Sequence, residues 1–452
     1  MRRRTLLQSL SLLGTGGAVG TAAGHPLPTD DGGSTPAGTP TGGDPLGTLD
    51  LSGGRELVTS PDGHTAYVAT GDGIALVDVV SPANPRLLAE RTDLLDSADP
   101  MRFVQDLAVA DDRLAVVGPA HPAEGAHGVV VFDVSDRGNP EQVGTVETET
   151  RIHNCDFDGR YAYLTANSRE GNPLLVLDTD TGSEAGTWSL LDADEQWADV
   201  YPGLRPLHDV TVRGDRAYLA YWDAGTWIVD VSDPADITAV GRVRGRERAA
   251  LADLDDALTD RREPPGNDHF VAVDDDATLL GVGAESWDVD GDDTGGPSGI
   301  ELFDIEDPTA PESLATIAPP STTDPAPGGV LTTAHNFEFT DGRLYSAWYN
   351  GGVRVHDVRA PSTPREIYHW RDSATSSFWT AQRGAGCFLA TSTNQNPGSE
   401  VTPGVYTFPD PALDGEVTGT PTDGAVGAAG DGFGVAATAA AVGLAAWRLA
   451  RR

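Results

Sequence analysis

GTWIVDVSDPADI (residues 225–237) contains a β-branched and aromatic run that ends in an aspartate, followed by a turn rich in Ser, Asp and Pro. Such a run favours a β-strand that leads directly into a tight turn. The same pattern recurs in GIALVDVVSPANP (73–85), GVVVFDVSDRGNP (128–140), GIELFDIEDPTAP (299–311) and GVRVHDVRAPSTP (352–364), with a weaker copy in PLLVLDTDTGSEA (173–185). The chain is therefore built from a repeated unit, and this repeat decides the fold.

Each repeat carries further strands around its central run. An Asp/Gly turn and an aromatic strand precede the run, as in DGRYAYLTA (158–166), and another strand such as PEQVGTVE (140–147) follows it. Four strands at a period of about 50 residues form one blade of a β-propeller. We expect the carboxylate that ends each run to cap the following turn rather than to do chemistry. These aspartates are Asp78, Asp133, Asp178, Asp230, Asp304 and Asp357.

The repeat resembles that of the LVIVD-repeat proteins of archaeal and bacterial surfaces, over residues 44–410. The resemblance implies a β-propeller and no single activity. Six full copies lie between 53 and 370, and residues 378–392 and 404–408 supply three strands of a seventh. PLGTLDL (45–51) resembles the fourth strand of the other copies, so we expect it to pair beside 404–408 and close the ring. The prediction is an all-β fold, a β-propeller of seven four-stranded blades, with six or eight blades as alternatives.

The composition limits the class of partner. The 452-residue chain has 69 acidic and 30 basic residues, a net charge of -39, and no lysine. Such an excess of negative charge repels nucleic acids and anionic lipid surfaces. The 39% of hydrophobic residues argues against a wholly disordered acidic chain. The composition resembles that of haloarchaeal proteins, which implies a halophilic surface adapted to molar salt.

The two ends carry targeting features. Residues 1–24 combine a basic start, a mildly apolar stretch and small residues, as export signals do, and Arg3-Arg4-Thr5-Leu6-Leu7 resembles the twin-arginine signal. Residues 25–43 and 411–431 are expected to be disordered tethers. Residues 432–452 are expected to form an apolar helix that either crosses the membrane or resembles an archaeal sorting signal. These features predict an exported protein on the extracellular face of the cell membrane or the cell surface, held only by its C-terminal anchor.

Loop length distinguishes the two faces of the expected propeller. The turns between first and second strands and between third and fourth strands are short. The loops on the opposite face, here called the top face, are long and individual: 91–103, 119–127, 191–206, 244–266, 284–298, 318–333 and 392–403. Long loops on one face mark it as the working surface.

A histidine stands where a top-face loop enters the first strand of four successive blades: His153, His208, His269 and His335. Neutral imidazoles that converge are the usual ligands of zinc, copper or iron. We therefore expect these four residues to bind a first-row transition metal, copper, zinc or iron, at the mouth of the channel. The alternative is that each ring packs between blades and hydrogen-bonds a backbone group. The neighbours Asn154, Asp209 and Asn336 are expected to tie down loop backbone.

Other candidate sites are weaker. WDVDGDDTGGPSGIE (287–301) has aspartates at calcium-loop spacing but lacks the glycine and the closing glutamate, so a solvated loop is expected. Cys155 and Cys387 lie far apart in the repeat and are expected to be buried thiols. Residues 244–263 are expected to form a short amphipathic helix that covers part of the top face.

Two functions fit these observations. The first is a cell-surface binding or scaffold propeller whose top-face loops, with Trp197, Tyr201 and Trp287, bind an unknown extracellular protein or small ligand. The second is a metal-dependent enzyme, such as an oxidoreductase, with the four histidines at its centre. The sequence contains no nucleophile motif, phosphate-binding loop or cofactor fingerprint, which favours the binding role and leaves enzymatic activity open.

Overall fold

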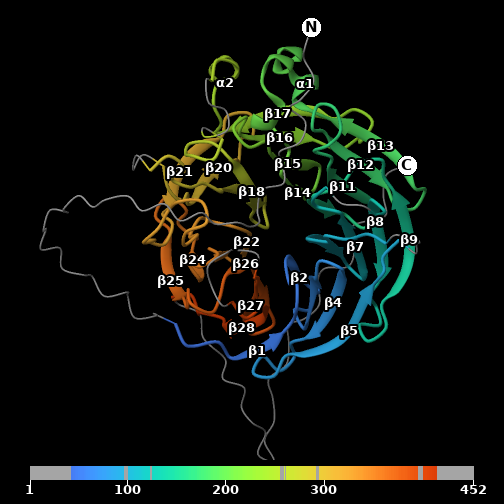
Figure 1. Ribbon diagram of the computed structural model, residues 1–452, viewed down its shortest axis with the longest axis vertical. Coiled ribbons are helices and arrows are strands. Elements are labelled where there is room, and N and C mark those ends of the chain that lie inside the picture. Colours follow the sequence, from blue (N-terminus) through green and yellow to red (C-terminus); the bar gives the residue numbers. More distant parts are fainter. Residues whose placement is uncertain are drawn as a thin grey trace, which may run out of the picture.

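A computed structural model describes residues 42–95, 100–122, 125–254, 259, 261–291, 295–394 and 401–414. Within these ranges the strands form seven four-stranded antiparallel sheets, arranged as blades around a central axis (Figure 1). The predicted seven-bladed propeller is confirmed. The expected signal peptide (1–24), the C-terminal helix (432–452) and most of both tethers lie outside the described residues. Among the helices within them, none has the length and apolar character needed to cross a membrane.

Each blade uses four strands, numbered from the axis outwards, and six blades use consecutive ones. The first three blades comprise β2 (Leu57–Thr59), β3 (Thr65–Ala69), β4 (Gly73–Asp78) and β5 (Arg86–Thr92); β6 (Asp106–Ala110), β7 (Arg113–Gly118), β8 (Gly128–Asp133) and β9 (Glu141–Glu147); β10 (Cys155–Phe157), β11 (Tyr161–Thr165), β12 (Leu174–Asp178) and β13 (Ser183–Trp188). The next three comprise β14 (Asp209–Arg213), β15 (Arg216–Ala220), β16 (Thr226–Asp230) and β17 (Thr238–Val243); β18 (Asp268–Val273), β19 (Leu279–Ala284), β20 (Ile300–Asp304) and β21 (Glu312–Ile317); β22 (Phe337–Thr340), β23 (Arg343–Ala347), β24 (Val353–Asp357) and β25 (Arg365–Trp370).

The seventh blade joins the two ends of the propeller. It consists of β26 (Phe378–Gly384), β27 (Cys387–Ser392), β28 (Gly404–Pro409) and, as its outer strand, β1 (Gly47–Asp50). β1 runs antiparallel to β28, with Gly47 opposite Thr407 and Asp50 opposite Gly404. The predicted closure by residues 45–51 is therefore confirmed, and it pairs the edge that three strands alone would leave open.

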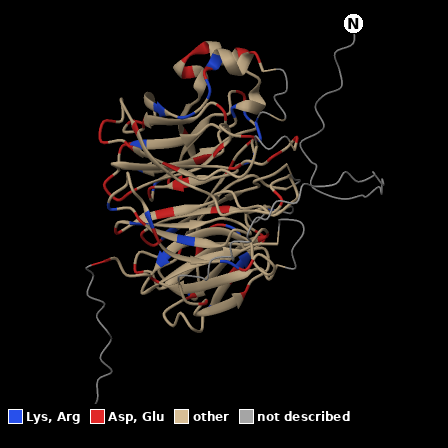
Figure 2. Cartoon of the chain, turned by 90° about the vertical axis from the view of Figure 1, so that its left-hand side faces the viewer, with Lys and Arg blue, Asp and Glu red and all other residues tan. Residues whose placement is uncertain are grey.

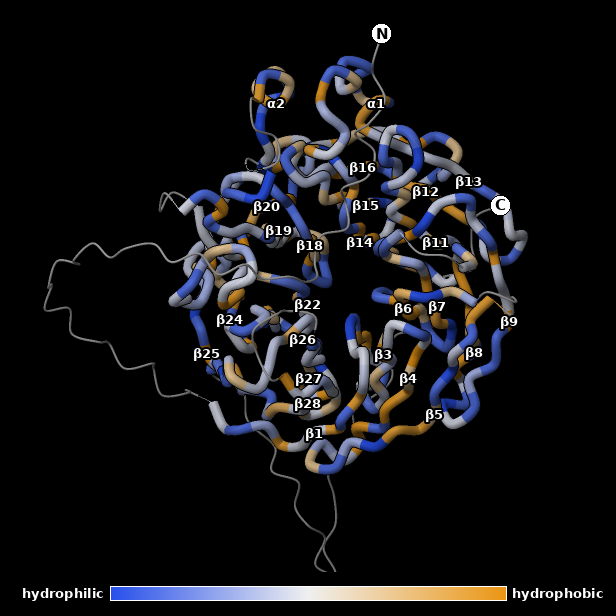
Figure 3. The backbone as a smooth tube through the Cα atoms, in the orientation of Figure 1, coloured by the Kyte–Doolittle hydropathy of each residue, from blue (hydrophilic) through white to orange (hydrophobic). Residues whose placement is uncertain are grey.

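Burial differs between the inner and the outer strands of each blade. The second and third strands are buried on both faces, as in β3 and β12, whereas outer strands such as β9 are mostly exposed. Apolar side chains of neighbouring blades pack against each other, and the hydrophobic segments in Figure 3 lie within the blades. Acidic residues are spread over the loops and the outer strands (Figure 2).

The six aspartates that end the central runs cap the turns that follow them, as predicted. In each case a carboxylate oxygen accepts the backbone N–H two residues further on, for example Asp133 from Ser135 at 2.9 Å and Asp230 from Ser232 at 2.9 Å. The same bond is made by Asp78, Asp178, Asp304 and Asp357. The repeated aspartate is thus a structural residue of the turn.

The helices lie in two top-face loops near the outside of the ring (Figure 1). They are α1 (Leu190–Ala193), the 3-10 helices η1 (Glu195–Asp199) and η2 (Pro202–Leu204), and α2 (Arg248–Ala252). α2 covers the middle of the helix expected over 244–263, and its Leu251 is buried against the neighbouring core. Part of the expected helix lies outside the described residues.

Buried carboxylates join the first strands of neighbouring blades. Each accepts a backbone N–H from the first strand of the next blade: Asp106 from Cys155 at 2.6 Å, Asp156 from Val212 at 2.6 Å, Asp209 from Val271 at 2.9 Å and Glu338 from Arg383 at 2.6 Å. Burial raises the pKa of Asp156 to about 6 and the pKa of Asp209 and Glu338 to about 7. These polar contacts along the channel wall hold the blades in register.

Candidate functional site

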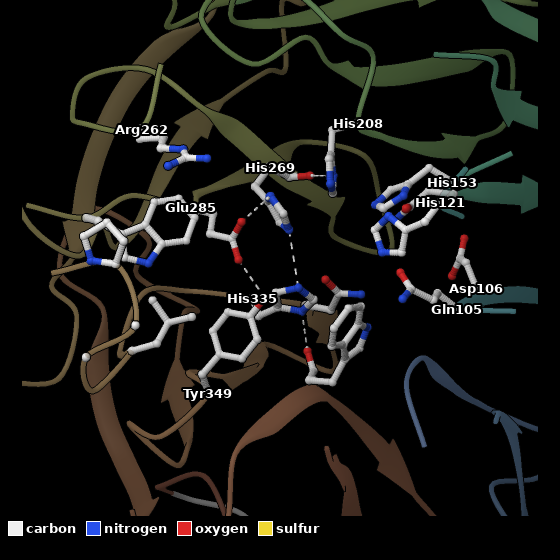
Figure 4. A pocket seen from close by; sticks show the side chains of 18 residues that line it. Gln105, Asp106, His121, His153, His208, Arg262, His269, Glu285, His335 and Tyr349 are labelled. Atoms are coloured by element: carbon white, nitrogen blue, oxygen red, sulfur yellow. Dashed lines mark hydrogen bonds and ion pairs between the residues drawn. The ribbon is translucent and has the colours of Figure 1, made fainter. Parts of the chain in front are cut away.

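A pocket of about 490 Å³ lies where the first strands begin, at the top-face mouth of the channel. Its wall combines imidazoles, aromatic rings and a few charged groups, and Figure 4 shows these side chains from close by. The residues that line it include His121, His153, His208, His269, His335, Arg262, Glu285, Trp287, Tyr349 and Trp379. All four histidines singled out in the sequence therefore contribute to one pocket.

The four predicted histidines form a row along the pocket wall. His208 immediately precedes β14 and His269 lies within β18, while His153 and His335 stand two residues before β10 and β22. The centroids of successive rings are 4.4 Å apart for His153 and His208, 3.8 Å for His208 and His269, and 5.0 Å for His269 and His335. Blades that diverge around the ring thus bring their histidines together at its centre.

Three of these rings also hydrogen-bond the backbone of a neighbouring blade. Nδ1 of His208 lies 2.9 Å from the carbonyl oxygen of His269, and Nδ1 of His335 lies 2.7 Å from that of Trp379. Nδ1 of His153 lies 3.1 Å from the carbonyl oxygen of Ala120. A carbonyl can only accept, so Nδ1 carries the proton and Nε2 of the neutral ring keeps its lone pair. Each of these rings can therefore hydrogen-bond a backbone carbonyl through Nδ1 and still act as a metal ligand through Nε2.

Two β-bulges position two of these three acceptors, the carbonyl groups of His269 and Trp379. The register between β18 and β19 shifts between Asp268 and Phe270, and that between β26 and β27 shifts between Phe378 and Thr380. His269 and Trp379 are the extra residues at these shifts. A bulge re-aims the extra residue, and here it turns the carbonyl groups of His269 and Trp379 towards the imidazoles of the preceding blades.

His269 and His335 form the tightest group, together with Glu285, which follows the end of β19. The two Nε2 atoms are 3.3 Å apart, and Nδ1 of His269 is 3.4 Å from Oε2 of Glu285. One ligand atom from each residue lies within 4.8 Å of the other two. His153 and His208 do not join this group. The phenol of Tyr349 donates to Oε1 of Glu285 at 2.7 Å and fixes the carboxylate (Figure 4).

Burial sets the charge of this group. It lowers the pKa of His335 to about 3 and holds the pKa values of His153, His208 and His269 well below the usual range. The imidazoles are therefore neutral at physiological pH, which is the form that binds metals. Burial raises the pKa of Glu285 to about 7, while the hydrogen bond from Tyr349 opposes this shift.

The sequence suggested that Asn154, Asp209 and Asn336, the residues next to three of the histidines, tie down loop backbone. This prediction is wrong. The amide of Asn154 donates to Asp209 at 3.0 Å, and Asp209 accepts from Val271 in a strand of the next blade. The amide of Asn336 donates to the buried Glu56. Each of these side chains therefore bonds a group from another blade.

Several residues that line the pocket were not predicted from the sequence. His121 comes from the top-face loop of the second blade, and its ring centroid lies 5.6 Å from that of His153. Glu285 follows Ala284, which stands opposite Asp268, and a regular antiparallel register places it beside Asn267 and not beside His269, so no sequence signal could have found it. Tyr349 and Trp379 carry no such signal, since aromatic residues at strand ends are common.

The three aromatic residues expected on the binding surface differ in where they lie. Trp287 lines the pocket and Tyr201 is 53% exposed, whereas Trp197 is only 3% exposed and packs in the core. The 3-10 helix η1 turns Trp197 inwards, where it meets Trp227 with ring centroids 6.2 Å apart. Trp197 therefore stabilises a loop and does not offer a binding surface.

The acidic loop at 287–301 places Asp288 and Asp290 near Glu263, and one carboxylate oxygen from each lies within 4.8 Å of the others. Backbone groups already use part of this set, because Glu263 accepts from Val289 and Asp288 accepts from Gly291. Asp292, the third aspartate of the calcium-like spacing, and Asp293, which stands in place of the glycine, lie outside the described residues. The two cysteines, Cys155 and Cys387, are buried thiols.

Comparison with known proteins agrees with the fold. A family model described as the LVIVD repeat matches residues 207–244, the span of the fourth blade. The β-propeller domain of Cps50 (Swd1) from Myceliophteria thermophila aligns with a TM-score of 0.54 and 9% identity over 80% of this chain and 99% of that one. The structure of U3-55K aligns with a TM-score of 0.56 and 11% identity over 81% of this chain and 98% of that one.

The WD40 repeats of RRP9 align similarly, with a TM-score of 0.55 and 11% identity over 81% of this chain and 96% of that one. A search of curated protein sequences finds no match. Likenesses at such low identity show the fold alone. The chain thus contains an LVIVD repeat and folds as a seven-bladed β-propeller.

Proposed function

We propose that this protein is a binding propeller that holds a small ligand in the pocket at the top-face mouth of its channel. The observation that carries the proposal is the pocket itself, whose volume of about 490 Å³ falls in the range of small-molecule sites. Aromatic rings from Trp287, Tyr349 and Trp379 offer apolar contact, and Arg262 and the imidazoles offer polar contacts. Such a mixture of apolar wall and few polar groups is typical of ligand sites.

The histidines make one side of the pocket rich in hydrogen-bond acceptors. Their Nε2 atoms are hydrogen-bond acceptors when Nδ1 donates to a carbonyl, as it does in His153, His208 and His335. A ligand that enters the pocket therefore meets acceptors along one side and the cation of Arg262 elsewhere. We expect a ligand that carries both donor groups and an anionic or carbonyl group.

The second candidate is a metal-dependent enzyme, with an oxidoreductase as one example. The observation that favours it is the row of rings from His153, His208, His269 and His335, whose successive centroids lie within 5.0 Å of each other. Copper, zinc or iron are the metals that such a donor set suits. Enzymatic activity would additionally need a substrate bound next to the metal, which this pocket has room for.

The proposed setting is the outside of the cell. The twin-arginine-like start, the apolar C-terminal segment and the acidic, lysine-free composition support an exported, halophilic protein held at the cell surface. A ligand would then be an extracellular small molecule or an exposed part of another surface protein.

The test of ligand binding uses the native protein. Protein purified in high salt is denatured, and the released small molecules are identified by mass spectrometry. Leu331, a partly buried residue of the pocket wall, is replaced by Trp to fill the pocket. Leu314→Trp is the matched control, since Leu314 is a partly buried leucine that lines a hollow elsewhere on the propeller.

The proposal expects a species released in stoichiometric amount by the native protein and by Leu314→Trp but not by Leu331→Trp. The native protein should also be more heat-stable with the isolated species than without it. Absence of any released species, together with no stabilisation by small-molecule extracts of the growth medium, would rule out a small-ligand pocket.

A further inference from the structure

The contact between His269 and His335 poses a problem of proton placement. Nδ1 of His335 donates to the carbonyl oxygen of Trp379 at 2.7 Å, so Nε2 of this neutral ring has no proton. It nevertheless lies 3.3 Å from Nε2 of His269. Two bare lone pairs at this distance repel each other, so a proton or a cation must lie between them.

A proton on Nε2 of His269 would solve this contact but create another. Nδ1 of His269 would then be an acceptor facing the Glu285 carboxylate, whose Oε2 is 3.4 Å away. The two groups do not have hydrogen-bond geometry, and Nδ1 of His269 is buried without a hydrogen-bond partner among the described residues. Glu285 already accepts from Tyr349. A chain of shared protons through these groups is therefore broken at His269.

We propose that His269, Glu285 and His335 bind one divalent first-row transition metal ion. Two histidine nitrogens and one carboxylate oxygen are a donor set found in zinc and non-haem iron sites with open coordination positions. The inference deepens the proposed function and rests on it, since the open positions face the pocket in which the ligand would bind. The ligand would then include a group that coordinates metals, such as a carboxylate, a hydroxamate-like oxygen pair or a thiolate.

The distances fit this assignment. Two nitrogens that each lie about 2.0–2.1 Å from a tetrahedral zinc are about 3.3–3.4 Å apart, and the Nε2 atoms of His269 and His335 are 3.3 Å apart. One oxygen of Glu285 and one nitrogen of each histidine lie within 4.8 Å of one another, so Glu285 would have to move closer to join the two Nε2 atoms around one ion. Tyr349 holds the other oxygen of this carboxylate.

The surroundings supply the outer contacts that metal sites need. The carbonyl of Trp379 orients His335 through Nδ1, and the phenol of Tyr349 orients Glu285. His208 stacks beside His269 with centroids 3.8 Å apart and takes the carbonyl of His269 as its partner. His208 and His153 thus lie outside the proposed donor set, and their Nε2 atoms would accept hydrogen bonds from a ligand in the pocket.

The test measures metal binding directly. Protein without a polyhistidine tag is stripped with a chelator and titrated with zinc in competition with a chromophoric chelator. Cobalt(II) is then bound in its place, and its visible absorption reports the number and type of donors. One zinc ion per chain should bind, and cobalt should show a low-coordinate site with nitrogen and oxygen donors.

Variants assign the ligands. Glu285→Gln and His335→Ala should each raise the Kd for zinc by at least about 100-fold, and Tyr349→Phe by about 10-fold through its effect on Glu285. His121→Ala and His153→Ala are matched controls from the same pocket and should keep the Kd within about 3-fold. Melting temperatures of the metal-free variants show whether each one folds, and Tyr349→Phe carries the test if a ligand variant does not.

Two results would overturn the assignment: no zinc binding by the stripped protein, or equal losses in the control and the ligand variants. Loss of binding in His153→Ala would point instead to a site made by the whole row of histidines. Leu331→Trp separates this inference from the proposed function. A protein that binds zinc, releases no small molecule and is not stabilised by extracts of the growth medium would retain the metal site and refute the ligand pocket.

Discussion

Nδ1 of His208 donates to the carbonyl oxygen of His269 at 2.9 Å, so that the side chain of one blade is bonded to the backbone of the next. The same relationship joins His335 to Trp379. In both cases the acceptor is the extra residue of a β-bulge, and the carbonyl of Trp379 also accepts the backbone N–H of Asn336 at 3.1 Å. The histidines therefore contribute to stability and to the site at once, and the two contributions can be measured separately.

Replacing His208 by Phe should destabilise the metal-free protein. An aromatic ring is kept, but the buried carbonyl of His269 loses its donor, which costs about 1–3 kcal/mol. Urea unfolding in the presence of a chelator measures this loss. His369→Phe is the control, because His369 contacts Glu366 at a partly exposed position and should change the free energy of unfolding by less than about 0.5 kcal/mol. Equal losses in both variants would contradict the importance of this bond.

The stability should depend on pH through the carboxylates between the blades. Burial raises the pKa of Glu338 from 4.5 to about 7, so between these values the folded protein keeps a proton that the unfolded chain releases. Rising pH therefore weakens the folded state across this window, and the full cost is present above about pH 7. Glu338→Gln cannot ionise, and it should reduce the loss of stability between pH 5 and pH 8 by about 1–3 kcal/mol.

Chemical unfolding at the two pH values in constant salt provides the measurement. Glu312→Gln, at the exposed start of β21, is the control and should leave the difference between the two pH values unchanged. A Glu338→Gln protein with the same pH dependence as the native one would show that this carboxylate stays ionised in the fold.

Removing β1 should open the seventh blade. Without residues 45–51, β28 becomes an exposed edge strand, and we expect the free energy of unfolding to fall by several kcal/mol, with a tendency to self-associate. Calorimetry and light scattering measure the two effects. Deleting seven residues from the segment 25–43 keeps the shortening but leaves β1 in place, so it should change neither quantity.

Export should depend on the paired arginines of the N-terminal signal. Replacing Arg3 and Arg4 by Lys keeps the charge and is expected to leave the precursor in the cytoplasm. Arg2→Lys is the matched control and should be exported normally. Fractionation followed by immunoblotting gives the result, and unchanged export of the double variant would refute the twin-arginine route.

Attachment to the surface should depend on the apolar C-terminal segment. Deletion of 433–452 is expected to release the protein into the medium, because this segment supplies the only apolar anchor predicted from the sequence. The amount in medium and membrane fractions measures this, and retention of the shortened protein on cells would indicate attachment through another surface component.

The fold could be predicted because its information is local and repeated. The strand that ends at Asp230, the turn that Asp230 caps and the strand after it recur often enough to give the number of blades. The position of β1 followed from counting strands, since an incomplete blade needs a partner. Convergence of the four histidines followed from their equivalent places in successive blades.

The details of the site could not be predicted in the same way. The bulge at His269 shifts the register by one residue, and Glu285 lies beside His269 as a result. The local sequence contains no signal that predicts this bulge. His121 comes from the loop between β7 and β8, which differs in length from the equivalent loops of the other blades. The pocket is shaped by residues that depart from the repeat. The repeat therefore predicts the blades but not the individual contacts in the pocket.

The pairing of β1 with β28 also governs when the protein can finish folding. Thr407 Oγ1 donates to the carbonyl of Gly47 at 3.1 Å across 360 residues of chain. Within each of blades one to six the strands pair with strands close in sequence, so this pairing can form while synthesis continues, whereas the contact of β1 has to wait for the last strand. The first strand to be synthesised therefore remains without its partner for the longest time. Molecules in which it pairs with another chain instead would be linked in a swapped dimer, and dilution during refolding should suppress that product.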